Sequence, residues 1–369
     1  MATIPSTMRS LVALKYCWPK EWEVADMPVP TIEDPKDILV KMHAGAIMTG
    51  DTQLARGAAR FLLGGLKLPH KIGIEGAGII AKVGPGVTQF KPGDAVYIFG
   101  QSRPMNMTAE KGYCSQYAVA RENLTLHKPA NVSFEEICSL ASVITAIQTI
   151  EMGLRLMRQN GVTDGLEGKT VFVPGALSAT GSVAIQVLRN VYGVGRIMAT
   201  VSTAKIPLVE QHLPGLVDQV VDYTRTPQLT DAIPAGSVDF VFNTQWQVTD
   251  LFALLKPDVG VVASIASIPS PELLHKMLPP LPFFVYWFAG LGQMWYSWKS
   301  RGTNIKHEFH SGNIGQREDL ERAGEVVALG KVKSVMRVVD LEDIETIRTE
   351  AQKVATGKGG VGKLIIKIP

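Results

Sequence analysis

Short apolar runs separated by glycine and proline characterise the chain from about residue 8 to about residue 120. Ser10–Lys15, Ile38–Met42 and Gly76–Val83 have the length and composition of strands, and Lys91–Asp94 has the composition of a turn. Turns at such short intervals predict a compact β-rich domain with a barrel-like course of the chain.

The pattern changes at about Ser133, after which helical and strand-like segments alternate. Phe134–Glu151 has the apolar spacing of a helix, and Ser133 with Glu136 predicts a capping box at its start. Alternation of this kind predicts a parallel, doubly wound sheet. The expected strands are Thr170–Val173, Arg196–Thr200, Gln219–Asp222, Phe240–Asn243, Gly260–Ile265 and Lys363–Ile368, and the expected helices are Ser182–Asn190, Pro207–His212, Asp250–Leu255, Glu318–Leu329 and Ile344–Ala355.

The stretch Lys169–Asn190 combines a buried strand, a turn of small residues from Gly175 to Gly181, and a helix. Unpaired backbone N–H groups and the positive end of the helix dipole at such a turn form a site for an anion. Small side chains let a pyrophosphate approach the backbone closely. An ordinary strand–turn–helix unit is the alternative interpretation, because the glycine spacing is not a strict G-x-G-x-x-G.

The end of the following strand favours one dinucleotide over the other. Proteins that bind NAD usually carry Asp or Glu there for the ribose 2′-hydroxyl. Residues 200–205 instead offer the hydroxyls of Ser202 and Thr203, the positive charge of Lys205 and no carboxylate. A 2′-phosphate would meet donors rather than repulsion, so the segment predicts NADPH as the cofactor.

Composition narrows the class of protein. The 369 residues have room for two domains, and a net charge of +3 without a basic run argues against nucleic acid as a partner. Cys17, Cys114 and Cys138 are scattered without a C-x-x-C pair, which suits a reducing compartment. Because Met1–Arg9 has the pattern of neither a secretory nor a transit signal, we expect a cytoplasmic protein.

Several stretches, in this order and spacing, resemble the medium-chain dehydrogenase/reductase superfamily. They are Gly73–Gly78, Val83-Gly84, Phe90–Val96, Gly112–Tyr117, Thr145-Ala146, the turn Gly175–Gly181, Val221-Asp222-Tyr223 and Gly362-Lys363-Leu364. The chain is most similar to the zinc-free quinone-oxidoreductase and enoyl-reductase branch. The resemblance implies an α/β fold, a doubly wound Rossmann domain plus a β-rich GroES-like barrel domain. Residues 1–133 would begin the GroES-like substrate domain, 134–305 would form the NADPH-binding Rossmann domain, and 306–369 would return to complete the substrate domain.

The chain departs from zinc-dependent members of the superfamily at two expected ligand positions. Met48 falls near a cysteine ligand, and Ile74 replaces the histidine of a G-H-E motif. Thioether and isoleucine cannot replace thiolate and imidazole at a catalytic zinc ion. The stretch from Tyr97 to Tyr117 has no counterpart of the cysteine-rich structural lobe, so we expect no metal site. Quinone-reductase relatives often carry Asn near Met48, so the expected substrate-binding residues, Met48 and Thr49, lack that polar contact.

The resemblance also implies the cofactor contacts, all at positions that suit ligand binding at the carboxyl ends of parallel strands. Ser178, Ala179, Thr180 and Gly181 would line the pyrophosphate, Ser202, Lys205 and Tyr223 would surround the 2′-phosphate, Thr145 would lie near the nicotinamide, and Asn243 and Ile265 would contact the ribose and the carboxamide. A strand-capping role for Tyr223 and a solvated surface role for Lys205 are the alternatives.

No residue is identified as catalytic. Hydride addition to the β-carbon of an enone produces an enolate, which needs a hydrogen-bond donor and then a proton. The candidate donors are Thr49, Asp51, Tyr113 and Tyr117. A capping Asp and packed tyrosines whose hydroxyls reach solvent are the simpler interpretations, and water is the other source of the proton. His43 and His70 have no spaced partners and are expected to be structural.

The segment Met277–Trp298 is rich in Phe, Trp and Tyr and carries no charge between Lys276 and Lys299. Its length nearly satisfies a membrane span. The residues expected to interrupt a helix are Pro279, Pro280, Pro282, Gly290, Gly292 and Gln293. We therefore favour a wall for a bulky apolar substrate or a subunit contact, and shallow insertion at a membrane surface is the alternative.

Together these features predict an NADPH-dependent, zinc-free oxidoreductase that reduces an activated C=C bond of an apolar enone or enoyl substrate. Quinone reduction is the alternative reaction. A hypothesis from another class is a cofactor-binding protein that acts through a partner, either as a trans-acting enoyl reductase beside a synthase or in association with a membrane. A homodimer, and a redox-coupled cyclisation or isomerisation, fit the same pattern.

Overall fold

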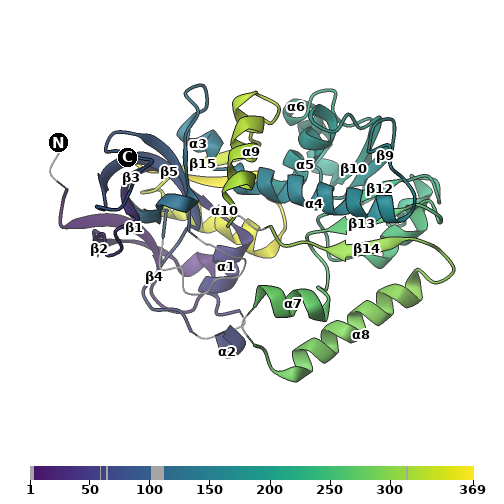
Figure 1. Cartoon of the computed structure of the whole chain (residues 1–369), viewed down its shortest axis with the longest axis horizontal. Helices are drawn as coiled ribbons and strands as arrows, with labels where there is room; N and C mark the ends of the chain where they lie inside the picture. The colour runs from purple at the N-terminus through teal and green to yellow at the C-terminus, as the bar shows by residue number, and fades with distance from the viewer. Residues whose placement is uncertain (1–3, 59, 64, 101–111, 279, 313–314) are drawn as a thin grey trace. The chain divides into compact units, whose positions relative to one another are not determined.

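The computed structural model describes residues 4–58, 60–63, 65–100, 112–278, 280–312 and 315–369. The chain divides into two compact units (Figure 1). The first comprises Met1–Ala141, Asn313–Gly330 and Met336–Pro369, and the second comprises Ser142–Gly312 and Lys331–Val335. The domain boundaries expected from the sequence, after residues 133 and 305, remain predictions.

Two sheets build most of the first unit. Their strands are β1 (Thr7–Ala13), β2 (Glu23–Pro28), β3 (Asp37–Ile47), β4 (His70–Lys71), β5 (Glu75–Val83), β6 (Ala95–Phe99), β7 (Tyr117–Arg121), β8 (Thr125–His127), β15 (Met336–Asp340) and β16 (Lys363–Lys367). The smaller sheet has the order β2-β1-β4, and the larger has the order β15-β16-β3-β5-β6-β8 with β7 paired to β3. All pairs are antiparallel except β15 with β16. The β-rich domain predicted from the turn spacing is thereby confirmed.

Strand periodicity places the core of this unit. Ile38, Val40 and Met42 of β3 are fully buried, because every second side chain of a strand faces the same side. They share one apolar cluster with Ile80 of β5 and Ile366 of β16. The helical segments around these sheets are η1 (Pro19–Glu21), α1 (Thr49–Ala55), α2 (Arg60–Leu63), η2 (Glu122–Leu124), α3 (Phe134–Ile137), α9 (Arg317–Ala328) and α10 (Ile344–Thr356).

Six parallel strands form the sheet of the second unit, in the order β11-β10-β9-β12-β13-β14. They are β9 (Thr170–Val173), β10 (Arg196–Val201), β11 (Gln219–Asp222), β12 (Phe240–Asn243), β13 (Val261–Ser264) and β14 (Lys306–Phe309). The chain adds β10 and β11 on one side of β9 and then returns to add β12 on the other. Such a reversal of strand order creates a crevice at the carboxyl ends of the two central strands.

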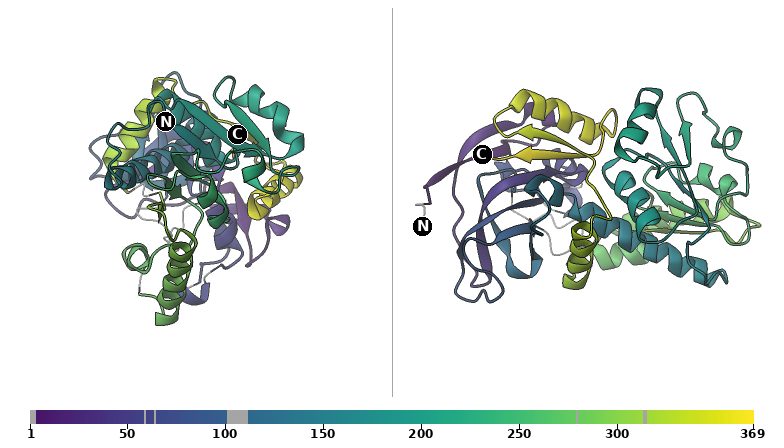
Figure 2. Two further views of the ribbon diagram at one scale, coloured as in Figure 1. Left: turned by 90° about the vertical axis from the view of Figure 1, so that its right-hand side faces the viewer. Right: turned by 90° about the horizontal axis from the view of Figure 1, so that it is seen from above.

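Helical segments cover both faces of this sheet (Figure 2). They are α4 (Leu140–Gln159), α5 (Ala179–Asn190), η3 (Thr203–Lys205), α6 (Ile206–His212), η4 (Leu229–Asp231), η5 (Thr249–Leu254), α7 (Pro271–Met277) and α8 (Phe283–Lys299). On one face, Val241 and Val262 pack with Leu251 of η5. On the other, α4 approaches so closely that a Cβ at Gly153 would collide with the ring of Phe240. The predicted doubly wound fold is confirmed.

The apolar helical stretch Phe134–Gln159 is long and apolar enough to cross a membrane by length and composition, but 78% of its most apolar window is buried within the protein. It therefore belongs to the core, and a turn at Cys138-Ser139 divides it into α3 and α4, whereas the sequence pattern predicts one helix over Phe134–Glu151. The capping box predicted at its start is confirmed: Ser133 Oγ accepts a hydrogen bond from the amide of Glu136 at 3.1 Å, and Glu136 Oε2 accepts one from the amide of Ser133 at 3.1 Å.

Two expectations about helices are wrong. The stretch predicted as a helix over Asp250–Leu255 is the 3-10 segment η5. The expected interruption at Gly290, Gly292 and Gln293 is absent, because α8 runs through all three residues as one helix that begins after Pro282. Tertiary contacts described below outweigh the weak helix propensity of glycine. Pro279, also expected to break the helix, lies outside the described residues.

Candidate cofactor site and substrate loop

The turn after β9 leads into the N-terminus of α5, where Ser178 is the N-cap residue. Its Oγ accepts a hydrogen bond from the amide of Gly181 at 3.0 Å, and its carbonyl oxygen accepts one from Ser182 at 3.0 Å. The first amides of a helix have no partner inside the helix. With those two amides occupied, the N–H groups of Ala179 and Thr180 are the first-turn donors that an anionic group can use.

Two glycines shape the surface of this turn. Gly175 has a φ of +79°, a conformation that side chains other than glycine rarely adopt. A Cβ at Gly181 would collide with the carbonyl oxygen of Gly175. The turn is thus closed by backbone contacts that only glycine permits, and Ser178, Ala179 and Thr180 at its end are half-buried. A dinucleotide pyrophosphate fits these donors.

Thr200, at the end of β10, fixes the turn from the neighbouring strand. Its Oγ1 accepts a hydrogen bond from the amide of Gly175 at 3.0 Å, and its carbonyl oxygen accepts one from Ala176 at 3.0 Å. Sequence reasoning did not assign Thr200 this role. The signal was present, because its side chain is a hydroxyl beside the predicted turn in a parallel sheet.

The ends of β10 and β11 form the corner predicted to hold the 2′-phosphate. Thr203 Oγ1 donates to Asp222 Oδ2 at 2.5 Å, and Thr224 Oγ1 donates to Asp222 Oδ1 at 2.6 Å. The hydrogen bond from Thr203 is the largest cause of the lowered pKa of Asp222. The sequence predicts that the Thr203 hydroxyl donates to a phosphate, but in the structure it donates to the carboxylate of Asp222 on the neighbouring strand.

Three of the predicted residues remain at this corner as accessible groups. Ser202 and Lys205 are half-buried, and the Tyr223 side chain is 53% exposed. The amide of Tyr223 donates to the carbonyl oxygen of Val201 at 3.2 Å, which ties β11 to β10 where both strands end. The structure thus brings the three side chains to one edge of the sheet.

Asn243 at the end of β12 is fully buried and holds the adjoining loops. Its Nδ2 donates to Gln245 O at 2.6 Å and to Ser264 Oγ at 2.9 Å, and its Oδ1 accepts from the Gln245 amide at 3.0 Å. Ile265 is half-buried, and its amide donates to Asn243 O at 3.0 Å. The predicted contacts of these two residues with a ribose and a carboxamide stay predictions.

Thr145 lies on α4, half-buried against the segment after β14. A Cβ at Gly312 would collide with its Oγ1, so the two residues are in close contact. Its predicted position near a nicotinamide also stays a prediction.

The loop after β12 contributes three residues that sequence reasoning missed. Thr244 Oγ1 donates to Pro174 O at 2.5 Å, and Gln245 Nε2 donates to Thr244 Oγ1 at 3.1 Å. Both side chains lie over Gly175, since a Cβ there would come within 2.9 Å of Gln245 Nε2. Trp246 follows with 68% of its side chain exposed. A polar run directly after a central strand was the signal that could have found them.

In the first unit, the predicted substrate-binding residues Met48 and Thr49 lie where α1 begins. Met48 is half-buried and Thr49 is exposed. Asp51 is 1% exposed, and its carboxylate accepts from the amide of Met48 at 2.7 Å and from the amide of Gly73 at 3.1 Å. Burial raises the pKa of Asp51 to about 7. Asp51 therefore caps a helix, whereas Met48 and Thr49 remain accessible.

A buried polar cluster lies in the same unit, centred on Glu75 of the Gly73–Gly78 stretch. Tyr97 Oη donates to Glu75 Oε2 at 2.9 Å, and the amide of Ala141 donates to the same oxygen at 3.3 Å. Lys363 Nζ pairs with Glu75 Oε1, and both side chains are almost completely buried. Burial raises the pKa of Tyr97 far above its usual value. We call Glu75, Tyr97 and Lys363 the Glu75 cluster.

The remaining candidate donors are poorly placed for chemistry at a surface. Tyr113 is fully buried with its hydroxyl directed to Val119 O at 3.4 Å, so the expectation that this hydroxyl reaches solvent is wrong. Tyr117 is half-buried on β7. Burial lowers the pKa of His70 to about 4, and His43 stacks on Phe134 with ring centroids 4.5 Å apart. Both histidines have the surroundings of structural residues.

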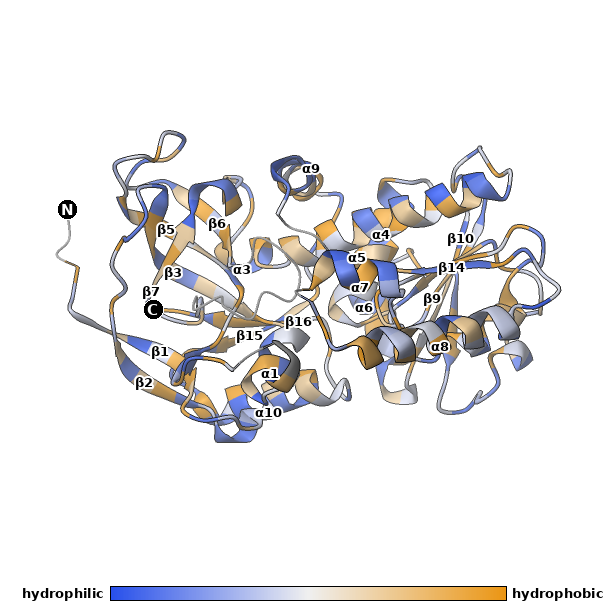
Figure 3. Cartoon of the chain, turned by 60° about the horizontal axis from the view of Figure 1, so that its bottom comes forward, coloured by the Kyte–Doolittle hydropathy of each residue, from blue (hydrophilic) through white to orange (hydrophobic). Residues whose placement is uncertain are grey.

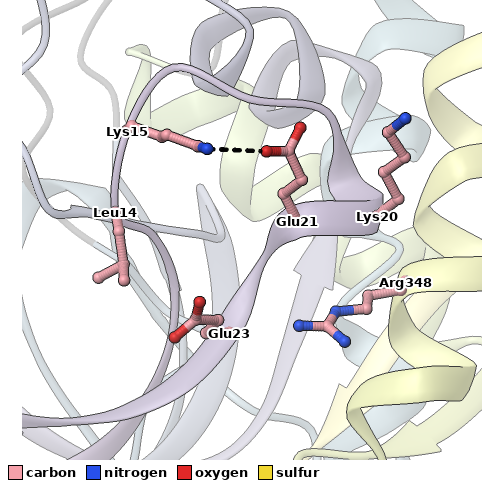
Figure 4. A pocket seen from close by; sticks show the side chains of 6 residues that line it. All are labelled: Leu14, Lys15, Lys20, Glu21, Glu23 and Arg348. Atoms are coloured by element: carbon pink, nitrogen blue, oxygen red, sulfur yellow. Dashed lines mark ion pairs between the residues drawn. The ribbon is translucent and has the colours of Figure 1, made fainter.

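A hollow of about 570 Å³ lies on the surface of the first unit and is lined by Leu14, Lys15, Lys20, Glu21, Glu23 and Arg348 (Figure 4). Lys15 and Glu21 form an ion pair across it at 3.0 Å. Its mixed charges suit neither an apolar substrate nor a dinucleotide. Across the described ranges, no three His, Cys, Asp or Glu residues are grouped to hold a metal ion, and the expectation of no metal site stays a prediction.

Residues 34–130 match the model of the alcohol dehydrogenase GroES-like domain. An NADPH-dependent alkenal/one oxidoreductase from Arabidopsis thaliana is 28% identical over 271 residues, which is 73% of this chain and 66% of that protein. A trans-enoyl reductase from Penicillium sp is 34% identical over 50% of this chain and 49% of that protein. This chain thus matches about half to two thirds of the length of these relatives. The solved structure of a quinone oxidoreductase from Coxiella burnetii superposes with a TM-score of 0.75 at 18% identity, covering 98% of this chain and all of that chain.

The fold and the carboxyl edge of the parallel sheet define a class of protein: the two-domain proteins that combine a GroES-like domain with a Rossmann domain for a nicotinamide cofactor. In sequence and fold the chain is similar to the medium-chain dehydrogenase/reductase superfamily, and the relatives it matches are enoyl reductases, alkenal/one reductases and quinone oxidoreductases. The resemblance drawn from the sequence motifs is confirmed.

Proposed function

We propose that this protein is an NADPH-dependent oxidoreductase that reduces the activated C=C bond of an apolar enone or enoyl substrate. The observation that carries the proposal is the turn at the N-terminus of α5. There the amides of Ala179 and Thr180 can meet a pyrophosphate within a sheet edge that also carries Ser202 and Lys205. We propose a cytoplasmic location, as expected from the sequence.

Each part of the edge has a role in this proposal. The turn holds the pyrophosphate, Lys205 and Ser202 hold the 2′-phosphate, and Asp222 keeps Thr203 and Thr224 in place beneath them. Bound NADPH supplies the hydride. Asp51, the carboxyl group nearest to Met48 and Thr49 along the chain, is buried and bonded to two backbone amides, so we propose that water delivers the proton.

The relatives favour C=C reduction over other reactions of the superfamily. Two of them are named for reduction of alkenals, alkenones or enoyl groups. Zinc-dependent members of the superfamily use the metal ion to polarise the oxygen of an alcohol. Reduction of an enone or enoyl C=C bond does not need that step, which agrees with Met48 and Ile74 at the positions where zinc ligands are expected. The substrate of this chain remains part of the proposal.

The first experiment follows NADPH consumption by the purified protein, with an apolar enone thioester and a naphthoquinone measured side by side. Quenching of tryptophan fluorescence on titration with NADPH serves as the independent measure of cofactor binding. We expect binding and faster turnover of the thioester. Failure to bind NADPH would overturn the proposal, and preference for the naphthoquinone would make the protein a quinone reductase.

Lys205 tests the choice of cofactor. In Lys205→Ala we expect the Kd for NADPH to rise about tenfold, because one charge-assisted hydrogen bond to the 2′-phosphate is lost. The Kd for NADH should be unchanged. Lys205→Arg keeps the charge and is the matched control, for which we expect less than a threefold change. Equal effects of Lys205→Ala on both cofactors would contradict the proposed position of the 2′-phosphate.

A partner-dependent reductase is the second candidate. It is favoured by the similarity to a trans-enoyl reductase and by the apolar side chain of Met48, which gives a small free substrate no polar contact. Under this alternative, the isolated protein binds NADPH but reduces neither test substrate. Activity would then appear only when the substrate is presented on a synthase carrier domain.

A further inference from the structure

Helix α8 is apolar over much of its length, as its orange and pale colours show (Figure 3), and many of its large apolar side chains are exposed. Six of its large apolar side chains are more than 45% exposed, and two more are exposed by 41% and 45%. In order, they are Phe283 (84%), Phe284 (45%), Trp287 (59%), Phe288 (60%), Leu291 (41%), Met294 (67%), Trp295 (50%) and Trp298 (57%). We call these eight residues the α8 stripe. They recur every three or four positions, so they lie along one side of a helix about 25 Å long.

The opposite side of α8 is fixed to its own unit. Gln293 Nε2 donates to Ile268 O at 2.6 Å, and Tyr296 Oη accepts from the Ile268 amide at 3.3 Å. A Cβ at Gly292 would come within 2.6 Å of the Ile268 side chain, so glycine permits this close approach. Ala289 is buried on the same side. The stripe is therefore the outward face of a docked helix.

Along the chain, the charges from Leu273 to His307 have one sign, and Glu272 and Glu308 are the acidic residues just outside this segment. From Leu273 to His307 the chain contains Lys276, Lys299, Arg301 and Lys306 and no Asp or Glu. Lys276 and Lys299, both exposed, stand just beyond the two ends of the apolar segment. Lys299 Nζ lies 5.0 Å from the ring centroid of Trp295 and 5.3 Å from that of Trp298. An aromatic face with cationic ends complements an anionic surface.

We propose that the α8 stripe docks the protein onto an anionic lipid surface, with α8 lying in the plane of the interface. Tryptophan and phenylalanine are the side chains that partition best at the level of the lipid headgroups. Lys299 at the C-terminal end of α8 meets anionic headgroups while its apolar stem extends along the rings of Trp295 and Trp298, and Lys276 on α7 adds a second exposed positive charge. A peripheral position of this kind would give the reductase access to apolar substrates dissolved in the membrane.

A second copy of this chain is the competing occupant, and charge argues against it. If two α8 stripes packed against each other, the interface would bring together the Lys276 and Lys299 side chains of both copies. The segment 273–307 supplies no carboxylate to pair with either. Like charges at the rim of an interface oppose association, whereas anionic lipid neutralises them.

The test is sedimentation of the full chain with vesicles of phosphatidylcholine alone and with about 30 mol% phosphatidylserine at near-physiological salt. We expect the protein to bind the anionic vesicles at least fivefold more tightly than the neutral ones. Lipids brominated on their acyl chains should quench its tryptophan fluorescence, since insertion brings the α8 tryptophans next to the chains. No binding to anionic vesicles overturns the proposal, and so does binding without quenching.

Two pairs of substitutions separate the contributions. Phe288→Ser with Met294→Ser keeps all tryptophans as reporters and should weaken vesicle binding at least tenfold, because two apolar side chains are lost from the interface. Lys276→Glu with Lys299→Glu should abolish the preference for anionic lipid. Phe61→Ser with Leu329→Ser removes two apolar side chains of the first unit, exposed by 87% and 65%, and should leave binding unchanged.

Two controls keep the outcome distinct from the proposed function. Every variant should retain NADPH binding, because the α5 turn is not altered. Sedimentation velocity without lipid then distinguishes the competing occupant. A dimer that dissociates in the Phe288→Ser, Met294→Ser variant and does not bind vesicles would overturn the proposal and assign the α8 stripe to self-association.

Discussion

The carboxyl edge of the parallel sheet and the Glu75 cluster both gather polar residues from distant parts of the chain, but they differ in burial. At the edge, two amides of the α5 turn are left for a ligand, and Tyr223 and Trp246 are more than half exposed. In the cluster, Glu75 and Lys363 are buried and paired with each other. A polar group that is buried and satisfied holds the fold, whereas accessible donors beside small residues can bind a ligand.

The largest effect is expected from breaking the Glu75 cluster. Lys363→Met leaves the Glu75 carboxylate buried without its counter-charge, which should lower the free energy of unfolding by about 3–5 kcal/mol in urea denaturation. The matched control is Lys36→Met, which breaks a 2.9 Å pair with Glu122 in which the lysine side chain is 51% exposed. Lys36→Met should lower the free energy of unfolding by less than about 1 kcal/mol.

A double variant makes this prediction sharper. Glu75→Leu with Lys363→Met removes both charges and should recover much of the lost stability. If Lys363→Met alone costs no more than Lys36→Met, the cluster does not hold the first unit, and the proposed contrast with the sheet edge is wrong.

Asp51 should give the next largest effect, as a dependence of stability on pH. Its pKa is raised from 3.8 to about 7 in the folded protein. Between these values the folded protein keeps a proton that the unfolded chain has lost. The free energy of unfolding should therefore fall as the pH rises from about 4 to about 7, by up to about 4 kcal/mol, and then level off.

The measurement is urea denaturation at several pH values from 4 to 8, for the wild type and for Asp51→Asn. The variant has no carboxyl group to titrate, so the slope over this range should be smaller in the variant, whatever its absolute stability. Identical slopes would show that Asp51 does not titrate as a buried acid.

At the sheet edge, two glycine substitutions separate backbone strain from ligand binding. Gly175 and Gly193 both have positive φ, +79° and +64°. Either change to alanine should therefore cost about 1 kcal/mol of stability. A Cβ at Gly175 would meet Thr244 and Gln245, whereas a Cβ at Gly193 would meet nothing within 4 Å. Gly175→Ala should weaken NADPH binding at least tenfold, and Gly193→Ala should not change it; equal affinities in the two variants would remove the turn from the site.

The smallest change in NADPH affinity is expected from substitution of an N-cap serine. Two such serines can be compared, Ser178 of the sheet edge and Ser133 of the first unit. Each accepts a hydrogen bond from an amide in the first helical turn, at 3.0 and 3.1 Å. Replacement of either by alanine should cost about 1 kcal/mol. Only Ser178→Ala should also alter NADPH affinity, by a few-fold in a fluorescence titration. An equal change in Ser133→Ala would indicate a general loss of folded protein.

The sequence could predict the features that depend on local pattern. The order of strands and helices, the Ser133 capping box and the α5 turn each follow from residues within one short segment. The position of Asp222 could not be predicted in this way. Its bond with Thr203 exists because β10 and β11 end side by side, although the two residues are 19 positions apart. The uninterrupted α8 also depends on a distant contact, with Ile268.

The pairing of β16 with β3 has a consequence for synthesis on the ribosome. Strand β16 occupies Lys363–Lys367, and it lies beside β3, which is made of residues 37–47. The first unit therefore cannot complete its sheet until about 300 residues beyond β3 have been synthesised. Throughout that interval Glu75 lacks Lys363, while the whole segment 142–312 can already fold. During synthesis, the first unit is therefore the part of the protein that stays accessible to chaperones and proteases for longest.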